Sequence, residues 1–94
     1  MDIDPSLLRA VVAVSETGGF TRAARRLNLT QPAVSHQIRR LEELVGRPLI
    51  RRTTGRLTLS EDGEDFLHHA RQILAGLDAL AQRFRPSAVA GVVR

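Results

Sequence analysis

The sequence predicts a small, mainly α-helical domain that carries one β-hairpin and ends in a long helix. Apolar residues recur at helical spacing in four stretches, each preceded by a residue able to cap a helix. Two short predicted strands flank a Thr-Thr-Gly turn at residues 53–55. The chain has 94 residues, which is enough for one hydrophobic core and too few for a catalytic α/β enzyme with a separate substrate domain.

The composition excludes several classes of protein. Hydrophobic residues make up 43% and charged residues 26%, as in a globular chain, and no apolar run is long enough to span a bilayer. Cysteine is absent, which excludes disulfides and cysteine metal sites and suits a reducing compartment. Asp2 and Asp4 follow Met1, where a secretory signal would carry basic residues and then an apolar core. We therefore expect a cytoplasmic protein that does not bind a membrane.

The first helix is expected to begin at Asp4-Pro5 and to end at Gly18-Gly19. Asp4 can cap the helix, and proline is well tolerated at the first helical position. Two consecutive glycines are a strong stop signal. The residues expected to form its buried face are Leu8, Val11, Val12 and Ser15, flanked by Leu7 and Val14.

Two further helices are expected to follow closely. Thr21 is the expected cap of a short second helix, and Asn28 can adopt the left-handed conformation that ends it. Thr30 then caps a third helix, whose first turn tolerates Pro32. Only residues 28–30 lie between the second and third helices. A short helix, a tight turn and a longer helix together form the helix-turn-helix pattern.

The third helix, over residues 31–45, has two contrasting sides. At about 100° per residue, its apolar side falls within a narrow arc and is expected to face the core. The apolar residues are Val34, Ile38, Leu41 and Val45. The outward side is polar and basic toward its N-terminal half, as a helix that enters the major groove of DNA requires. The outward residues are Pro32, Ser35, His36, Arg39 and Arg40.

Positive charge is concentrated in the middle of the chain. All 14 basic residues are arginine, and residues 21–60 hold nine of them against two acids, although the whole chain carries only +4. Such density is typical of a surface that binds a polyanion, and a merely solvated basic surface is the alternative on charge alone. The strands predicted here are Leu49–Arg52 and Arg56–Leu59, with Gly55 supplying a positive φ in the turn. Arg51, Arg52 and Arg56 would then cluster at the tip and sides of this hairpin, placed for phosphates or the minor groove.

The last helix, over residues 61–85, is expected to extend beyond the domain. Ser60 can cap it, and the acidic residues of its first turns suit the helix dipole. At roughly 1.5 Å per residue it is about 36 Å long, too long for a three-helix domain to cover. Its apolar stripe follows a repeat of about 3.5 residues, which is typical of a seam with a second helix. We expect this stripe to be a homodimer contact, with the Leu67 side facing the chain's own domain; packing of the stripe on its own domain is the alternative. The stripe is Phe66, Ala70, Ile73, Leu77, Leu80 and Phe84.

Together these residues resemble the N-terminal domain of LysR-type transcriptional regulators, a family of bacterial winged helix-turn-helix proteins. The resemblance runs from about Leu8 to Gly63 and includes the long helix. It is carried by many positions at fixed spacing rather than by one motif. These are Phe20-Thr21, Ala23-Ala24, Leu27, Thr30-Gln31-Pro32-Ala33-Val34-Ser35, Gln37-Ile38, Leu41-Glu42, Val45-Gly46, Leu49, Arg52, Leu59-Ser60 and Gly63.

The resemblance implies a division of the chain and a function. Residues 1–60 would be a winged helix-turn-helix DNA-binding domain, 61–85 a linker and dimerisation helix, and 86–94 the hinge and start of a missing effector-binding domain. The chain would bind double-stranded DNA at an interrupted inverted repeat as a homodimer, compatible with a tetramer in the full-length protein. No cofactor is expected in this chain, and a small-molecule effector is expected for the missing domain.

The resemblance also implies roles for individual residues. Gln31, Pro32, Ser35 and His36 would contact bases, since glutamine suits adenine and proline can pack on a thymine methyl. The residues expected on the DNA backbone or in support of the wing are Thr30, Arg39, Arg40, Arg52 and Arg56. In the alternative, Gln31 and Ser35 only solvate a helix start, and Arg39 pairs with Glu43 one turn later.

Two departures from the family pattern bear on the predicted site, and one matching position stays outside it. His36 stands where the family often has arginine, and its protonation would make binding pH-sensitive. Gly55 stands where the family commonly has the wing arginine; whether Arg56 replaces it stays open, because adjacent strand residues face opposite ways. Glu42 is expected to be an ion-pair partner rather than a DNA contact.

Two rival functions are less well supported by the sequence. The chain is not expected to be an enzyme or to bind a metal, because His68 and His69 have no third ligand at useful spacing and point about 100° apart. Asp65 with His69 and Glu64 with His68 are expected to be surface pairs. A winged helix that binds protein would show an apolar outward face on its third helix, and here that face is polar and basic.

Overall fold

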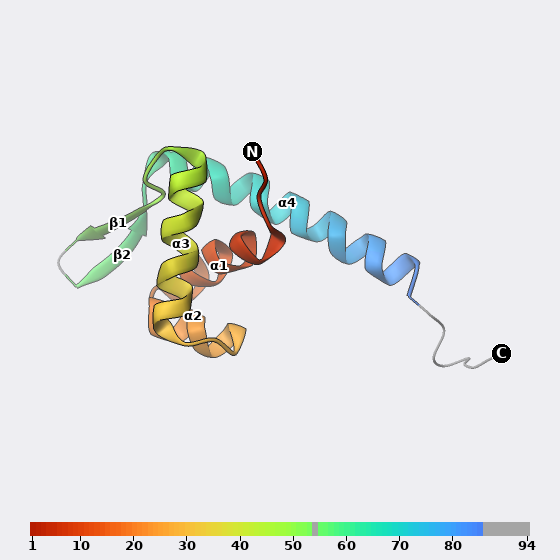
Figure 1. Cartoon of the computed structure of the whole chain (residues 1–94), viewed down its shortest axis with the longest axis horizontal. Helices are drawn as coiled ribbons and strands as arrows, with labels where there is room; N and C mark the ends of the chain where they lie inside the picture. Colours follow the sequence, from red (N-terminus) through yellow and green to blue (C-terminus); the bar gives the residue numbers. More distant parts are fainter. Residues whose placement is uncertain (54, 86–94) are drawn as a thin grey trace.

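A computed structural model describes residues 1–53 and 55–85 of the chain. Figure 1 shows three helices packed together, a hairpin that projects from them, and a long helix that crosses them and continues away on the other side. We call the first three helices and the hairpin, residues 5–59, the head. The elements are α1 (Pro5–Thr17), α2 (Phe20–Leu27), α3 (Gln31–Val45), β1 (Ile50–Thr53), β2 (Arg56–Leu59) and α4 (Glu61–Arg83).

The hydrophobic core surrounds α1, which contacts α2, α3, α4 and β2. Because neighbours lie on several sides of α1, its buried surface is wider than one stripe: Ala10 and Ala13 are buried, while Val12 and Ser15 of the predicted face are only half-buried. The other elements each contribute a few side chains. The core residues are Leu7, Leu8, Ala10, Val11, Ala13, Val14, Ala23, Ala24, Val34, Ile38, Leu41, Leu49, Ala70 and Leu74.

Three of the four predicted helix caps are confirmed. Asp4 accepts from Ser6 N at 2.8 Å, Thr30 Oγ1 from Ala33 N at 3.2 Å, and Ser60 Oγ from Gly63 N at 2.9 Å. The backbone N–H of Ser6 also holds the pKa of the Asp4 carboxyl below its ordinary value.

The prediction that Thr21 caps α2 is wrong. The helix begins at Phe20 with Gly19 as its cap, and no side chain bonds to its first turn. Ala23 N donates to Gly19 O at 3.1 Å, so the helical hydrogen bonds already start at Gly19. The two-residue turn after α1 is therefore tighter than the capping pattern indicates. The end of α2 is as predicted, with Asn28 in the left-handed region at φ 57°.

The hairpin pairs β1 with β2 in antiparallel register, and Gly55 has the expected positive φ of 72°. Leu49 was expected in the first strand but lies just before it and is fully buried. Arg52 is opposite Leu57, on the side of the hairpin shared by Ile50 and Leu59. The other side of the hairpin carries Arg51, Thr53, Arg56 and Thr58.

Only the first part of α4 packs against the head. Leu67 and Leu74 are buried, Leu77 is half-buried, and every described residue from Asp78 onward is exposed. The assignment of Ala70 to the dimer stripe is a misprediction, since Ala70 is 1% exposed and lies in the chain's own core. At about 100° per residue it lies about 60° from Leu67 and about 40° from Leu74, on the same side of the helix.

The two ends of α4 are defined differently. At its start, Gly63 faces the Leu49 carbonyl so closely that a Cβ would overlap it. The helix ends at Arg83, two residues before the predicted end, with Phe84 as its C-cap. Within residues 1–53 and 55–85, no helix combines the length and apolar character needed to cross a membrane. The predicted hinge at residues 86–94 lies outside the described residues.

Candidate nucleic-acid interface

The N-terminal half of α3 presents a polar face to solvent while its opposite side is locked into the core. Val34, Ile38 and Leu41 are buried, so the rotation of the helix about its own axis is fixed. On the other side Ser35 is half-buried, and the remaining predicted contact residues are exposed. The exposed residues are Thr30, Gln31, Pro32, His36, Arg39 and Arg40. The structure therefore places the residues predicted to contact bases on one side of α3 with Thr30, Arg39 and Arg40. Arg52 lines the groove beside α3, but Arg51 and Arg56 lie on the other side of the hairpin, so the three hairpin arginines do not form the single cluster that was predicted.

The hairpin is joined to α2 by a contact that the sequence did not predict. The guanidinium carbon of Arg52 lies 4.8 Å from the centroid of the Phe20 ring, within the range of a cation–π contact. A groove of about 100 Å³ runs beside this contact, between α3 and β1, and Ser35 and Arg39 line its α3 side. Arg52 is thus placed to support the hairpin through Phe20 with its charge still exposed.

Glu42 holds the start of β1 onto α3. One carboxylate oxygen accepts from Leu49 N at 2.7 Å and from Ile50 N at 3.1 Å. We expected an ion-pair partner here, but Glu42 forms no ion pair in the described part of the chain and instead satisfies two backbone donors. A carboxylate that accepts two N–H groups at the root of the hairpin fixes where the hairpin leaves the head.

Removing this carboxylate is expected to destabilise the chain. Glu42→Ala leaves the Leu49 and Ile50 N–H groups without their acceptor, and losing hydrogen bonds to a charged group costs about 1.5–3 kcal/mol. Urea unfolding followed by circular dichroism measures the free energy of unfolding. Glu43→Ala removes the neighbouring exposed carboxylate and is expected to change it by less than about 0.5 kcal/mol. Equal effects of the two substitutions would contradict the role given to Glu42.

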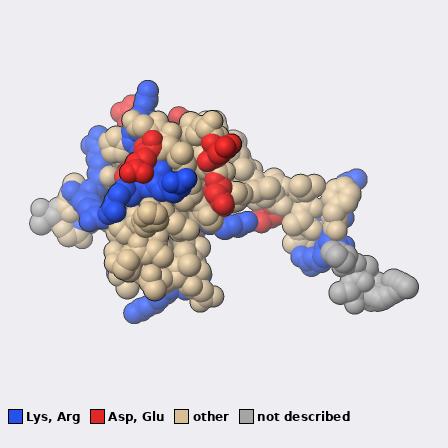
Figure 2. Space-filling model, viewed as in Figure 1, with Lys and Arg blue, Asp and Glu red and all other residues tan. Residues whose placement is uncertain are grey.

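The arginines of α3 and the hairpin keep their charge available. Four ion pairs between an arginine and a carboxylate occur among residues 1–53 and 55–85, and none involves Arg39, Arg40 or an arginine of the hairpin. The alternative that Arg39 pairs with Glu43 is therefore not realised. Figure 2 shows basic side chains gathered over the middle of α3 and toward the hairpin, a distribution that attracts a polyanion.

The two histidines of α4 take no part in this face. His69 Nε2 lies 3.7 Å from Asp65 Oδ1, as the spacing predicted, and both side chains are exposed. The described residues contain no cluster of three or more side chains able to hold a metal ion. The predicted pairing of Glu64 with His68 is not formed.

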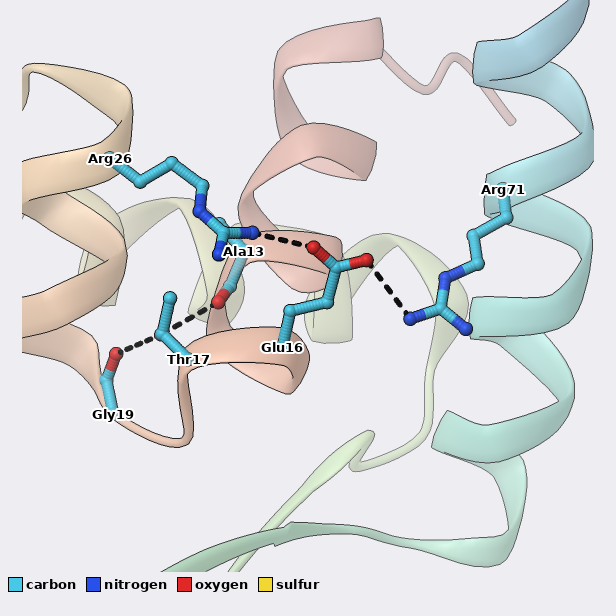
Figure 3. Close-up of polar contacts among 6 residues, drawn as sticks. All are labelled: Ala13, Glu16, Thr17, Gly19, Arg26 and Arg71. Carbon is cyan, nitrogen blue, oxygen red and sulfur yellow. Dashed lines mark hydrogen bonds and ion pairs between the residues drawn. The ribbon is translucent and has the colours of Figure 1, made fainter.

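A separate polar cluster joins α1, α2 and α4 (Figure 3). Glu16 accepts from Arg26 Nη1 at 2.5 Å and from Arg71 Nη2 at 3.1 Å. The two arginines hold the pKa of the Glu16 carboxyl below its ordinary value, and the hydrogen bond from Arg26 is the largest cause of this shift. Because the pKa of Glu16 is lowered in the folded chain, these contacts stabilise the fold at neutral pH. This stabilisation is lost as the pH falls through the lowered pKa of Glu16. No local sequence pattern predicts this cluster, because Arg26 and Arg71 are 10 and 55 residues from Glu16.

The chain is similar in sequence to known helix-turn-helix regulators. The model for "Bacterial regulatory helix-turn-helix protein, lysR family" matches residues 5–64. The HTH-type transcriptional regulator CfxR of Cupriavidus necator is 51% identical over 67 residues, which are 71% of this chain and 21% of that protein. The HTH-type transcriptional regulator BudR of Klebsiella aerogenes is 50% identical over 78 residues, 83% of this chain and 54% of BudR. The chain thus spans between about a fifth and about half of the length of these relatives.

Solved structures of other proteins are similar to this chain in both fold and sequence. A complex of the BenM DBD with catB site 1 DNA superposes with a TM-score of 0.85 and 32% identity, covering 93% of this chain and 98% of that one. Full-length CbnR with its target DNA gives a TM-score of 0.81 at 32% identity, covering 92% of this chain and 30% of CbnR. The predicted fold class, a mainly α winged helix-turn-helix with a long C-terminal helix, is confirmed. The chain belongs to the lysR family of bacterial regulatory helix-turn-helix proteins.

Proposed function

We propose that this chain binds double-stranded DNA in a sequence-specific way as a transcription regulator, with α3 in the major groove and the hairpin on the backbone or in the minor groove. The observation that carries the proposal is the exposed, polar N-terminal face of α3, held in one orientation by Val34, Ile38 and Leu41. A helix of this kind, preceded by a short helix and a tight turn, is the recognition helix of helix-turn-helix proteins. The DNA complexes of BenM and CbnR support the proposal.

Two groups of residues have separate tasks in this proposal. Gln31, Pro32, Ser35 and His36 contact base edges and choose the sequence. The arginines supply affinity for any sequence through the phosphates, so binding weakens as salt rises. The residues proposed for the backbone or the wing are Thr30, Arg39, Arg40, Arg52 and Arg56. Thr30 also keeps its capping bond to Ala33 N, which leaves the lone pairs of its hydroxyl only partly used.

Pairing of two copies through α4 is the second part of the proposal. Ile73, Leu80 and Phe84 are 51%, 55% and 71% exposed, although each is a large apolar side chain. They follow one another at spacings of seven and four residues, so they form one stripe on the part of α4 that leaves the head. Phe66 and Leu77 border the stripe and are half-buried against the head. Two heads joined in this way would fit an inverted repeat with half-sites about one helical turn apart.

We propose no catalytic role for the chain. Its relatives are transcriptional regulators, which supports regulation rather than catalysis. We propose that it acts in the cytoplasm, where bacterial DNA lies.

Substituting one residue from each group tests this division of tasks. Gln31→Ala is expected to relax the preference at one base pair by about 1–3 kcal/mol and to leave binding to other positions unchanged. Arg52→Ala is expected to weaken binding to all sequences alike and to reduce the salt dependence by roughly one phosphate contact. Fluorescence anisotropy with a duplex selected from a random pool, and with single-base variants of it, measures both effects. An unchanged base preference in Gln31→Ala would remove Gln31 from the proposed base contacts.

A further inference from the structure

Two exposed ion pairs join α4 to α1 beside the apolar contacts of Ala70 and Leu74. Arg9 Nη2 is 3.9 Å from Asp78 Oδ1, and Arg71 Nη2 is 3.1 Å from Glu16 Oε2. The helices are antiparallel here, and on each helix the charged residues are seven apart, which places them two turns apart on one face. If α4 moved by two turns, Glu64 would face Glu16 and Arg71 would face Arg9, and both contacts would become repulsive. The charge pattern therefore favours a single register.

Glu16 also connects this register to the helix-turn-helix. Its second carboxylate oxygen accepts from Arg26 of α2, so one side chain holds α2 and α4 at the same time (Figure 3). The end of α1 that carries Glu16 is itself held: Thr17 Oγ1 donates to Ala13 O at 2.7 Å and Arg22 Nη1 donates to Thr17 O at 2.9 Å. Because α2 leads directly into α3, Glu16 forms one of the polar connections between α4 and the helix-turn-helix, beside the packing of both on α1.

A small change in that orientation has a large effect at the far end of α4. Leu74 is the last fully buried residue of α4 and Leu77 is half-buried against the head, whereas every described residue from Asp78 onward is exposed. From Arg71 to Arg83 the helix rises about 18 Å at roughly 1.5 Å per residue. A tilt of about 10° at Arg71 would therefore move the far end by about 3 Å, close to the rise of about 3.4 Å for one base pair along a strand.

We propose that Glu16 is a positioning residue which, by holding Arg26 and Arg71 together, sets the separation of the two half-sites that a dimer of this chain binds. This inference rests on the proposed function, because it needs both DNA binding and pairing through α4. Glu16 itself lies on α1, outside the residues proposed to touch DNA. Its substitution is therefore expected to change the preferred spacing of half-sites and not the affinity for one half-site.

The first test needs no DNA. The chain has no cysteine, so Arg25→Cys on α2 and Gln82→Cys on α4 allow two spin labels at known places. An excess of unlabelled chain restricts the measured distances to labels within one chain. Glu16→Gln is expected to widen the distance distribution at least twofold, whereas Glu61→Gln, which neutralises an exposed carboxylate of α4 without an ion pair, is expected to leave it unchanged. An unchanged width in Glu16→Gln would overturn the proposal.

The second test uses duplexes built from a half-site selected out of a random pool. One set carries two half-sites at the selected spacing and at spacings longer or shorter by one and two base pairs, and one duplex carries a single half-site. The unsubstituted chain is expected to favour the selected spacing at least tenfold over its neighbours, and Glu16→Gln less than threefold, with single half-site affinity within twofold. A full preference retained by Glu16→Gln would overturn the proposal.

Reversing the charges of all three residues distinguishes the loss of these two contacts from a general loss of folding. The triple substitution Glu16→Arg, Arg26→Glu, Arg71→Glu rebuilds both contacts with opposite signs and is expected to restore the narrow distance distribution and the spacing preference. Failure of this variant to restore either, when circular dichroism shows it folded, would overturn the proposal. If the unsubstituted chain binds no duplex, the proposed function fails instead, and the spin-label distances alone decide whether Glu16 fixes α4.

Discussion

The double substitution Ile73→Glu, Leu80→Glu is expected to abolish pairing of the chain and to weaken its binding to an inverted-repeat duplex by about 10²–10⁴-fold, the usual gain from linking two binding modules. Both side chains are at least half exposed, so the charges add no unpaired group to the core of the head. In a dimer, however, they would place carboxylates in an apolar seam, where unpaired charges are costly. Light scattering gives the mass and anisotropy gives the affinity.

A control on another exposed side of the same helix separates the seam from general charge effects. Gln72→Glu, Ala79→Glu adds the same two charges at the same spacing, about 80–120° around the helix from Ile73 and Leu80. It is expected to leave the mass of the dimer unchanged. Leu77 is less suitable for this test because it also packs against the head. A dimeric mass for Ile73→Glu, Leu80→Glu would remove the proposed seam.

Gly63→Ala is expected to destabilise the fold strongly, with a loss of about 1–3 kcal/mol in the free energy of unfolding. The added Cβ would overlap the Leu49 carbonyl, which is backbone and cannot turn aside as a flexible side chain would. Leu49 is fully buried, and its N–H is held by Glu42 and its carbonyl by Ser60 N. Relief of the overlap therefore requires α4 to move away from the base of the hairpin.

A second glycine of α4 provides the matched control. Gly76 has no atom within 4 Å of an added Cβ and no positive φ, so alanine fits there without strain. Gly76→Ala is expected to stabilise the chain by about 0.5–1 kcal/mol, since alanine is the better helix former. Urea unfolding of both variants at one protein concentration checks the pair. Equal stability of the two variants would contradict the close approach of α4 to Leu49.

The local features of this fold follow from the sequence because the signals that specify them are local. Asp4, Thr30 and Ser60 cap the next turn with their own side chains, and Gly55 occupies a turn that needs a positive φ. The inward and outward sides of α3 depend only on helical periodicity, so Val34, Ile38 and Leu41 are buried as predicted; Val45 of the predicted core side and Ser35 of the outward side are both half-buried. The candidate interface was predictable for the same reason, since most of it lies within two turns of one helix.

The features that the sequence did not predict depend on contacts between distant elements. Glu42 lies near arginines in the sequence, yet its partners are backbone N–H groups seven and eight residues away, exposed only because β1 begins there. Ala70 fits a partner-facing repeat and a core-facing stripe equally well until the position of α1 is known. The contacts of Arg52 with Phe20 and of Glu16 with Arg71 join residues 32 and 55 positions apart, and no spacing rule reaches that far.

Selection of random duplex DNA by this 94-residue chain near physiological salt, followed by sequencing of the bound pool, tests the central proposal most directly. We predict an enriched inverted repeat whose half-sites lie about one helical turn apart, because two copies of α3 would enter successive major grooves on one side of the duplex. A pool without any enriched sequence, bound only at low salt, would contradict sequence-specific binding by α3. The arginines of α3 and the hairpin would then form a surface that binds any polyanion without sequence preference.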